Sequence, residues 1–423
     1  VKPIVRYMHV EATSGIVLVA CTVAALILAN SQLGEGFAAF WSMKFGFQVG
    51  SFEMIHSLRH WINDGLMAIF FFVVGLEVKR EIVLGELKEP RKAILPVAAA
   101  LGGLVVPAGI YLVLQWGQPT ARGWGIPMAT DSACVVGAMA ILGPRVPHVL
   151  RIMVLSLAIV DDIGAIVVIA IGYTDDLNVQ ALLLGFVGIL VVSFLARLGV
   201  RSFGVYTVVG TLVWVAFHES GVHATIAGVI LGLMTPATSY FSTSFFGSML
   251  NRASDIVHGG DYDTLSHRAG RLRTFLRSAR ESISPLEYLE ARLHPWVSFL
   301  IMPVFALANA GVSLHFEDLG DPIAVAVAAG LFLGKPIGIF LFSWIAIKLF
   351  LKVLPEGLTW GGLLGASCLA GIGFTMALFI ASLALKDEFL DAAKIGVLSG
   401  SALSAILGMA LLLLLLPKKV TER

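Results

Sequence analysis

The sequence predicts an all-α polytopic membrane protein with about twelve transmembrane helices, from its composition, its recurring apolar stretches and its uneven distribution of basic residues. Hydrophobic residues make up 57% of the 423 residues and charged residues only 13%, and the mean hydropathy is +0.89. Soluble domains carry roughly 25% charged residues, so this chain lacks the polar surface that contact with water on all sides requires. Its formal net charge of +1 argues against binding to nucleic acid.

Apolar stretches recur along the whole chain, and a transmembrane helix needs about 20 apolar residues. A chain of 423 residues can therefore hold about a dozen spans joined by short loops. We expect residues 1–423 to form a single integral membrane domain with spans at residues 12–30, 59–78, 94–115, 124–142, 150–172, 180–196, 203–218, 222–236, 295–312, 322–346, 360–384 and 392–416.

The Lys and Arg residues indicate the orientation, because cytoplasmic loops carry an excess of them. An even number of spans places both termini on the same side. The loops of that side would hold 23 of the 29 basic residues, including seven arginines between Arg252 and Arg292. The opposite loops would hold only Lys44, Arg59, Arg122, Lys386 and Lys394. We therefore expect both termini to be cytoplasmic.

Two loops differ from the short connections elsewhere. Residues 40–58 alternate apolar and polar side chains around Gly50, which predicts a small periplasmic β-hairpin. The hairpin can pair edge to edge with a second copy of the chain, or it can serve as a capping loop. Residues 237–290 form a long basic cytoplasmic loop, in which residues 265–293 have a spacing compatible with a basic surface helix. Such a segment, helical or partly disordered, is expected to lie near anionic lipid.

Two spans, the fourth and the eleventh, contain helix breakers near their middles. These breakers are Gly125, Pro127 and Thr130 beside Asp131, and Gly371 and Gly373. A broken helix at membrane depth is tolerated only where its backbone is buried in protein or lines a wet cavity. Each broken span is the middle one of three, spans 3–5 and spans 10–12, and the expected orientation makes the two triplets run in opposite directions. The sequence therefore predicts inverted-topology repeats.

Charged residues inside the spans mark a candidate cation site, because each one costs about 2.5–3.5 kcal/mol on insertion scales. They are Asp64, Glu77, Asp131, Asp161, Asp162 and Lys335. Asp161 and Asp162 lie near the centre of the fifth span, and neighbours on a helix point about 100° apart, so both can face one cavity. Two adjacent buried carboxylates titrate as a coupled pair, which can hold protons or bind a small hard cation such as sodium.

Lys335 is expected to be the only buried cation. It can neutralise a carboxylate, or the C-terminal ends of the two broken helices, where partial negative charge gathers. Asp131 lies where the N-terminal ends of those helices would gather positive charge. A purely structural role for Lys335 and Asp131 is the alternative. Glu77 can pair with a nearby base or belong to an ion path, and His223 is either a structural histidine or a pH sensor.

Seven motifs, spread over nearly the whole chain, form a specific set: MATDSA at 128–133, LAIVDDIGA at 157–165, GVHATIAG at 221–228, LHPWV at 293–297, FALANAG at 305–311, LGKPIG at 333–338 and GIGFTMALFIASLA at 371–384. Together they resemble the NhaA family of bacterial sodium/proton antiporters, for which inverted repeats are already described. The resemblance implies a transporter of the bacterial inner membrane, with no enzymatic activity and no cofactor.

The resemblance also implies roles for individual residues. Asp162 would be the principal sodium carboxylate, and Asp161 would be its partner, paired with Lys335 in one state. Asp131 and Thr130 would lie at the helix crossing. A cytoplasmic region linked to activation at alkaline pH would be lined by Glu77, Glu81, Glu290 and His294.

At the level of the whole protein, the resemblance implies electrogenic exchange of cytoplasmic Na⁺ or Li⁺ for external H⁺ by alternating access, with a role in sodium and pH homeostasis. Family members commonly form homodimers through the periplasmic hairpin. Two features depart from the family pattern: the segment between Pro236 and Pro285 is longer than expected, and Ala291 follows Glu290 where a family member can have histidine.

Two other functions are compatible with buried carboxylates. A proton-coupled symporter of an organic solute would need polar or aromatic side chains around a larger pocket, which these Ala-, Val- and Ile-rich spans lack. An intramembrane aspartyl protease needs two Asp residues that face each other from two helices and share a proton. Asp161 and Asp162 are adjacent and diverge, which disfavours the protease.

Overall fold

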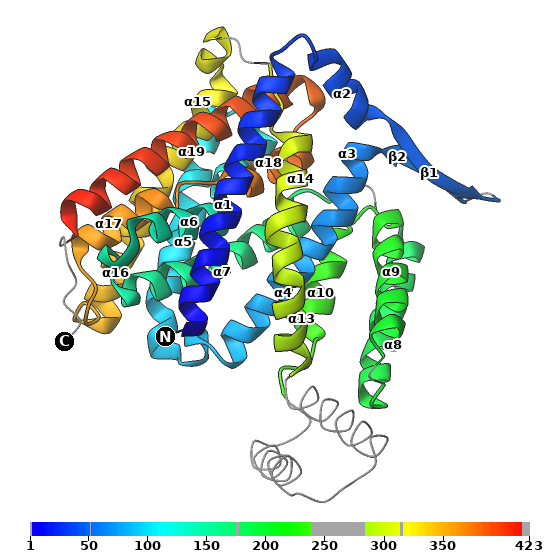
Figure 1. The fold of residues 1–423 in the computed structure, drawn as a ribbon, viewed down its shortest axis with the longest axis horizontal. Helices are drawn as coiled ribbons and strands as arrows, with labels where there is room; N and C mark the ends of the chain where they lie inside the picture. Colours follow the sequence, from blue (N-terminus) through cyan, green and yellow to red (C-terminus); the bar gives the residue numbers. More distant parts are fainter. Residues whose placement is uncertain are drawn as a thin grey trace, which may run out of the picture.

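The computed structural model describes residues 2–50, 52–174, 177–200, 202–238, 284–313 and 316–416. It is a bundle of helices with one β-hairpin projecting from it (Figure 1). Each of the twelve expected spans coincides with a helix or with helices in series, so the predicted all-α membrane architecture is confirmed.

The first six expected spans correspond to the following elements, with the short α2 (Gly34–Ser42) and η2 (Glu86–Lys88) between them: α1 (Lys2–Ala29), α3 (Leu58–Trp61) with η1 (Ile62–Leu66) and α4 (Met67–Val83), α5 (Pro90–Leu114), η3 (Pro119–Met128) with α6 (Ser132–Leu142), α7 (His148–Gly172) and α8 (Val179–Arg197). The turn η4 (Gly143–Arg145) joins α6 to α7.

The second six correspond to α9 (Phe203–Glu219), α10 (Thr225–Met234), α13 (Pro285–Trp296) with η5 (Val297–Ile301) and α14 (Met302–Asn309), α15 (Pro322–Ala329) with η7 (Gly330–Gly334), α16 (Lys335–Ala346) and η8 (Ile347–Leu351), α17 (Trp360–Leu369) with α18 (Phe374–Ala384), and α19 (Asp387–Leu415). A short turn, η6 (Phe316–Gly320), precedes α15.

Not every element has the length of a full span. By length and composition, seven described helices can cross a membrane, or up to nine if each bent pair of helices counts as one span. The seventh and eighth expected spans correspond to shorter apolar helices, because α9 has 17 residues and α10 has only 10. The number of spans therefore fits the expectation only roughly.

The hairpin is formed by β1 (Lys44–Val49) and β2 (Phe52–Ser57), which pair antiparallel from Lys44 opposite Ser57 to Val49 opposite Phe52. Gly50, with φ of +62°, lies at the turn, as the sequence suggested. The indole Nε1 of Trp61 donates a 2.7 Å hydrogen bond to the carbonyl oxygen of Phe45, which ties the hairpin to α3. We call the end of the bundle that carries the hairpin the hairpin end.

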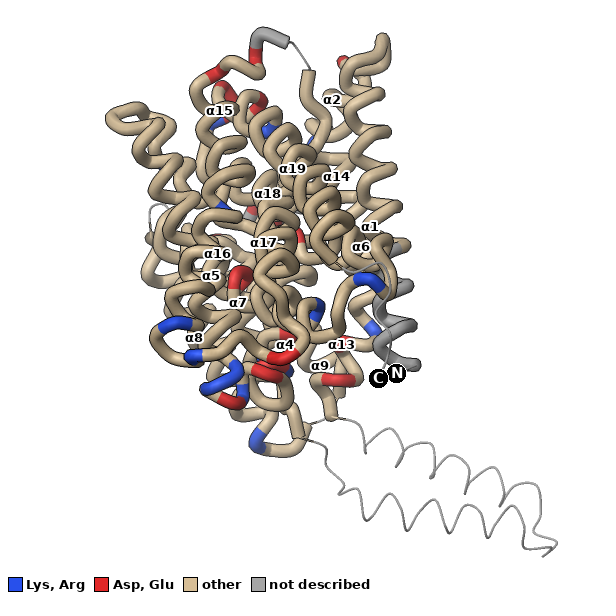
Figure 2. The backbone as a smooth tube through the Cα atoms, turned by 90° about the vertical axis from the view of Figure 1, so that its left-hand side faces the viewer, with Lys and Arg blue, Asp and Glu red and all other residues tan. Residues whose placement is uncertain are grey.

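Figure 2 shows most Lys and Arg residues of the described chain near the opposite end of the bundle. This is the end at which α4 stops and α5 begins, and we call it the basic end. α4 runs from the hairpin end to the basic end (Figure 1).

Both predicted breaks are present. The fourth span is interrupted at residues 129–131, between the 3₁₀-helical η3, which contains Pro127, and α6. The eleventh is interrupted between α17 and α18, which are inclined by 46°. Gly371 and Gly373 lie in this second break, where a Cβ on Gly371 would come within 2.6 Å of the carbonyl oxygen of Leu331.

Glycines allow α5 and α16 to pack backbone against backbone. A Cβ added to Gly102 would lie 2.1 Å from the carbonyl oxygen of Gly338, and one on Gly338 would lie 2.0 Å from that of Gly102. Small residues at membrane helix interfaces permit such close approach. The contact fixes the position of Lys335, three residues before Gly338 on α16.

Two of the sequence-based expectations are wrong, and a third concerns residues that the structure does not describe. Lys394 was expected in a loop, but it is buried in α19, so Lys335 is not the only buried cation. The long loop was expected to extend to residue 290, but residues from Pro285 onward are helical because Ser284 and Glu287 form a capping box that starts α13. The remainder of that loop, residues 239–283, and most of its proposed basic helix lie outside the described residues.

Candidate cation-binding site

Asp131 lies where two helices begin. One of its carboxylate oxygens accepts a 3.1 Å hydrogen bond from the backbone N–H of Cys134 at the start of α6. The other accepts a 3.1 Å bond from the N–H of Thr375 at the start of α18, and a further bond from the Thr375 hydroxyl. Helix N-termini carry partial positive charge, so this carboxylate is placed where two such charges meet.

The two broken spans also join through their backbones. The N–H of Asp131 donates a 2.7 Å hydrogen bond to the carbonyl oxygen of Ile372, and the Thr130 hydroxyl donates a 2.9 Å bond to that of Ala370. Because the starts of α6 and α18 face each other at this point, the two broken spans run in opposite directions. Their crossing has the polarity that inverted repeats require.

Lys335 lies at the centre of the buried charges. Its ammonium donates a 2.5 Å hydrogen bond to Asp161 and a 2.7 Å bond to the hydroxyl of Thr130. The side chains of Lys335 and Asp161 are 0% and 2% exposed, so this ion pair is shielded from solvent. Of the two possibilities left open by the sequence, Lys335 therefore neutralises a carboxylate, and it contacts the crossing through Thr130.

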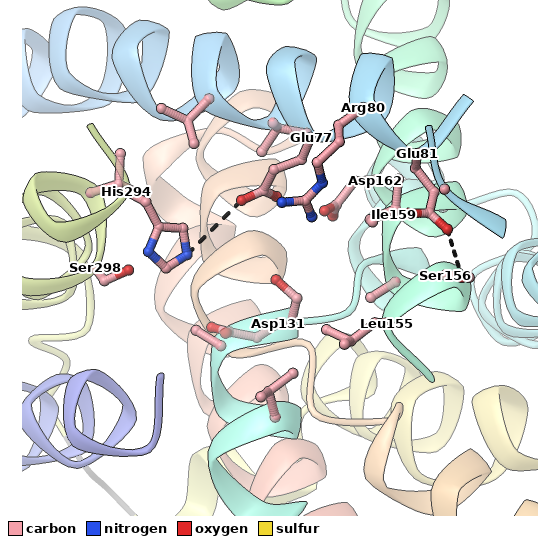
Figure 3. Close-up of a pocket in the computed structure, with 18 of the residues that line it drawn as sticks. Glu77, Arg80, Glu81, Asp131, Leu155, Ser156, Ile159, Asp162, His294 and Ser298 are labelled. Carbon is pink, nitrogen blue, oxygen red and sulfur yellow. Dashed lines mark hydrogen bonds and ion pairs between the residues drawn. The ribbon is translucent and has the colours of Figure 1, made fainter. Parts of the chain in front are cut away.

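Asp162 is in a different environment from Asp161. It lines a cavity of about 540 Å³, whereas Asp161 and Lys335 are not among the described residues around that cavity. Within the described chain, the Asp162 carboxylate accepts no hydrogen bond and forms no ion pair. Asp131 lines the same cavity, and Figure 3 shows it below Asp162 and Glu77. One carboxylate of the adjacent pair is thus neutralised, and the other is left facing the cavity.

The cavity extends from Asp162 toward the basic end, where its lining includes Glu86, Lys88 and Lys92. Its wall carries Glu77 and Glu81, two of the acidic residues that the family resemblance associates with pH response. Ser156 of α7 donates a 3.0 Å hydrogen bond to Glu81, and His294 lies 4.0 Å from the carboxylate of Glu77 (Figure 3).

Glu290, on α13, lies next to this group. Its buried carboxylate, 8% exposed, forms an ion pair with Arg80 of α4, which itself lines the cavity. The ion pair connects two helices that border the cavity. Glu77, Glu81, Glu290 and His294 are therefore brought together along one wall and its outer edge.

His223 lies elsewhere. Its Nε2 is 2.8 Å from the carbonyl oxygen of Tyr173, just beyond the end of α7 that is remote from the cavity. The Tyr173 hydroxyl in turn accepts a 3.0 Å hydrogen bond from the N–H of Gly125. His223 thus contacts Tyr173 after α7, and Tyr173 in turn contacts Gly125 in η3. His223 does not belong to the group of Glu77 and His294.

Comparison with known proteins decides the family. The sequence model of the family described as "Na+/H+ antiporter 1" matches residues 5–412. The chain belongs to this family. The resemblance seen in the motifs is confirmed, and the chain is a multi-pass membrane protein of a transporter family.

Relatives in the Na⁺/H⁺ antiporter 1 family match over almost their full length. The chain is 56% identical to "Na(+)/H(+) antiporter NhaA" of Rhodopirellula baltica, over 100% of this chain and 96% of that protein. It is 51% identical to the protein of the same name from Rhizobium meliloti, over 99% and 96%. It is 50% identical to "Na(+)/H(+) antiporter NhaA 1" of Acidiphilium cryptum, over 96% and 91%.

Several residues of this family member's site were not singled out from the sequence. Thr375 binds Asp131, Arg80 pairs with Glu290, and Ser156 binds Glu81. Thr375 follows the Gly371–Gly373 break by two residues, a position at which a polar side chain near a helix start could have been noticed. Arg80 and Ser156 carry no comparable signal, because their partners come from other helices.

Proposed function

We propose that the chain exchanges Na⁺ for H⁺ across the membrane, with both ions competing for Asp162. The observation that carries this proposal is the difference between the two adjacent carboxylates: Asp161 is bonded to Lys335, whereas Asp162 faces the cavity and accepts no hydrogen bond from any described residue. A carboxylate oxygen is a suitable ligand for a hard cation such as Na⁺. Protonation removes the negative charge that attracts the cation, so the two ligands exclude each other.

Asp161 and Lys335 are proposed to provide a second proton for each Na⁺ exchanged. When Na⁺ draws Asp161 into its coordination shell, Lys335 loses its partner, and burial then favours its neutral form. Release of protons from more than one group for each Na⁺ bound makes the exchange electrogenic. Thr130 and Asp131 hold the crossing at which these groups meet. Li⁺, a smaller hard cation with the same ligand preference, is an expected second substrate.

The shape of the site supports alternating access. The cavity reaches Asp162 from the basic end, so this conformation exposes the carboxylate to that side. The excess of Lys and Arg supports a cytoplasmic location for the basic end, with both chain termini, in a bacterial inner membrane. The two interrupted spans, joined by few backbone hydrogen bonds, are the elements expected to move when the site opens to the other side.

Glu77, Glu81, Glu290 and His294 are proposed to adjust transport to pH. Glu77, Glu81 and His294 line the cavity that leads from the basic end to Asp162, and Glu290 pairs with the cavity residue Arg80, so their charges change the local concentration of cations. His223 lies outside this group, and we assign it a structural role. Regulation of this kind suits a transporter that controls cellular sodium and pH.

The hairpin is proposed to join two copies of the chain. Each strand of a two-stranded sheet has one edge without a partner, which is a template for pairing with another chain. A homodimer through this edge would be lost on removal of residues 44–57, which light scattering of the purified protein in detergent can measure. Anionic lipid is the expected partner of the basic end.

Transport by reconstituted protein tests the main proposal. Proteoliposomes with an imposed proton gradient should lose that gradient when NaCl is added, and Asp162→Asn should abolish the response. Glu388→Gln, an exposed residue at the start of α19, is the matched control and should transport like the unaltered chain. Normal sodium-driven proton flux in Asp162→Asn would overturn the proposal.

The two alternative functions gain no support from the geometry. A protease dyad needs two carboxylates sharing one proton, but Asp161 is bonded to Lys335. A symporter of an organic solute would dissipate the proton gradient only when that solute is present. Sodium-dependent flux in solute-free vesicles separates the symporter from the exchanger.

A further inference from the structure

Three histidines converge at the hairpin end, remote from the cation site. His56 lies on β2, His60 on α3, and His218 one residue before the end of α9. One ring nitrogen from each lies within 4.8 Å of the others. Among the described residues, this is the only group of three or more His, Cys, Asp or Glu side chains with the spacing of a metal site.

The spacing of the nitrogens matches tetrahedral coordination. The Nε2 atoms of His56 and His218 are 3.4 Å apart. Zinc binds imidazole nitrogen at about 2.0–2.1 Å, so two ligands of a tetrahedral zinc ion are about 3.3–3.4 Å apart. A metal ion placed between these two nitrogens therefore needs no large movement of either ring.

Asp64 orients His218 for such a role. Its Oδ2 lies 3.2 Å from Nδ1 of His218, which leaves Nε2 of the same ring directed at His56. A carboxylate behind a metal-binding imidazole is the usual arrangement, because it fixes the ring and makes the free nitrogen a better ligand. Trp214 stacks on the His218 ring at 5.8 Å and donates a 3.3 Å hydrogen bond to the Asp64 carbonyl oxygen.

His60 supplies the third ligand. Its ring centre is 4.3 Å from that of His56 and 5.5 Å from that of His218. The Nε2 atom of His60 is buried and makes no hydrogen bond within the described chain, although Asp64 Oδ2 is 3.5 Å away. A buried polar atom without a hydrogen bond is costly unless it has another partner, which a metal ion would provide.

We propose that His56, His60 and His218 bind a divalent transition metal ion, with Zn²⁺ as the best fit, and that Asp64 positions His218. Three neutral imidazoles favour zinc over Mg²⁺ or Na⁺, which prefer oxygen. The fourth position is left to water. Because the ligands come from β2, α3 and α9, bound metal would fasten the hairpin to two helices of the bundle. The site shares no residue with the proposed exchange of Na⁺ and H⁺.

Calorimetric titration of purified, tag-free protein with ZnCl₂ tests the proposal. We expect saturable binding of one Zn²⁺ per chain, accompanied by a rise in melting temperature that MgCl₂ does not produce. His56→Gln and His218→Gln should each weaken Zn²⁺ binding at least tenfold, because each removes one of three ligands. His148→Gln, an exposed histidine at the start of α7, is the matched control and should bind Zn²⁺ like the unaltered chain.

His60→Gln covers the case in which the other two variants fail to fold, because the His60 side chain is 39% exposed. It too should weaken binding at least tenfold. Zn²⁺ affinity unchanged in a folded His60→Gln variant, or equal stabilisation by MgCl₂, would overturn the proposal. Sodium/proton exchange is measured on metal-free protein, so the outcome of the zinc titration does not depend on it. Each of the two proposals can therefore fail without the other.

Discussion

Lys335 and Asp161 form a 2.5 Å ion pair between α16 and α7 with almost no exposure to solvent. A buried charge is tolerated when it is paired and hydrogen-bonded, and removal of one partner typically costs about 3–5 kcal/mol. The pair therefore serves both the fold and the proposed transport, since it must be stable at rest and break when a cation binds.

Lys335→Ala should lower the thermal stability of the purified protein by an amount equivalent to about 3–5 kcal/mol, because it leaves Asp161 charged and without its partner. Lys348→Ala is the control, since Lys348 is exposed and lies 6.0 Å from the centre of the Trp344 ring. The double variant Lys335→Ala/Asp161→Ala should recover part of the loss. Equal melting temperatures for Lys335→Ala and Lys348→Ala would contradict a stabilising pair.

Gly102→Ala should destabilise the protein by about 1–3 kcal/mol, because its methyl group would collide with the backbone of Gly338. Gly109→Ala on the same helix is a matched control, since its added Cβ has no atom within 4 Å. Alanine is the better helix former, so the control should be neutral or stabilising by about 0.5–1 kcal/mol. Thermal melting in detergent compares the two. A tolerated Gly102→Ala would mean that α5 and α16 are not in close contact.

Arg80→Gln and Glu290→Gln should show energetic coupling of about 0.5–3 kcal/mol in a double-mutant cycle, because they form an ion pair that is partly shielded from water. Denaturation of the four proteins in detergent gives the coupling. The exposed pair Lys92 and Glu89, 3.2 Å apart, provides the comparison and should couple more weakly. Additive effects of the Arg80 and Glu290 substitutions would show that the pair does not join α4 to α13.

Asn309→Ala should cost about 1–3 kcal/mol, because it removes both hydrogen bonds to Asn63 and leaves that amide unsatisfied. Asn309 donates a 2.8 Å bond to Asn63 and accepts a 3.2 Å bond from it, which joins α14 to the π-helical η1. Asn63→Ala in the same protein should add little further loss. Asn178→Ala, which removes the cap of α8, should instead add its full effect to that of Asn309→Ala. Thermal melting of the single and double variants distinguishes these outcomes.

Features that depend on residues close together in the sequence were predicted correctly. The turn at Gly50, the breaks around Thr130 and Gly371, and the spans themselves depend on neighbours within a few residues, and each was found where expected. The start of α13 differs from the expectation because the capping box of Ser284 and Glu287 begins the helix within the expected loop. Lys394 is counted with the loop residues although the expected span at residues 392–416 includes it, and in the structure it is buried in α19.

By itself, the sequence determined that this chain crosses a membrane many times and that two of the spans are broken. It also showed that acidic residues and Lys335 lie inside the spans. These features follow from the scarcity of charge and from helix breakers, which a linear sequence displays. The pairing of Lys335 with Asp161, 174 residues away, was implied by the family resemblance, and the tertiary structure shows it. Only the tertiary structure decided that Asp162 faces the cavity and that three histidines meet at the hairpin end. Helical periodicity tells which residues share a face, but the rotation of each helix is set by packing against helices distant in sequence.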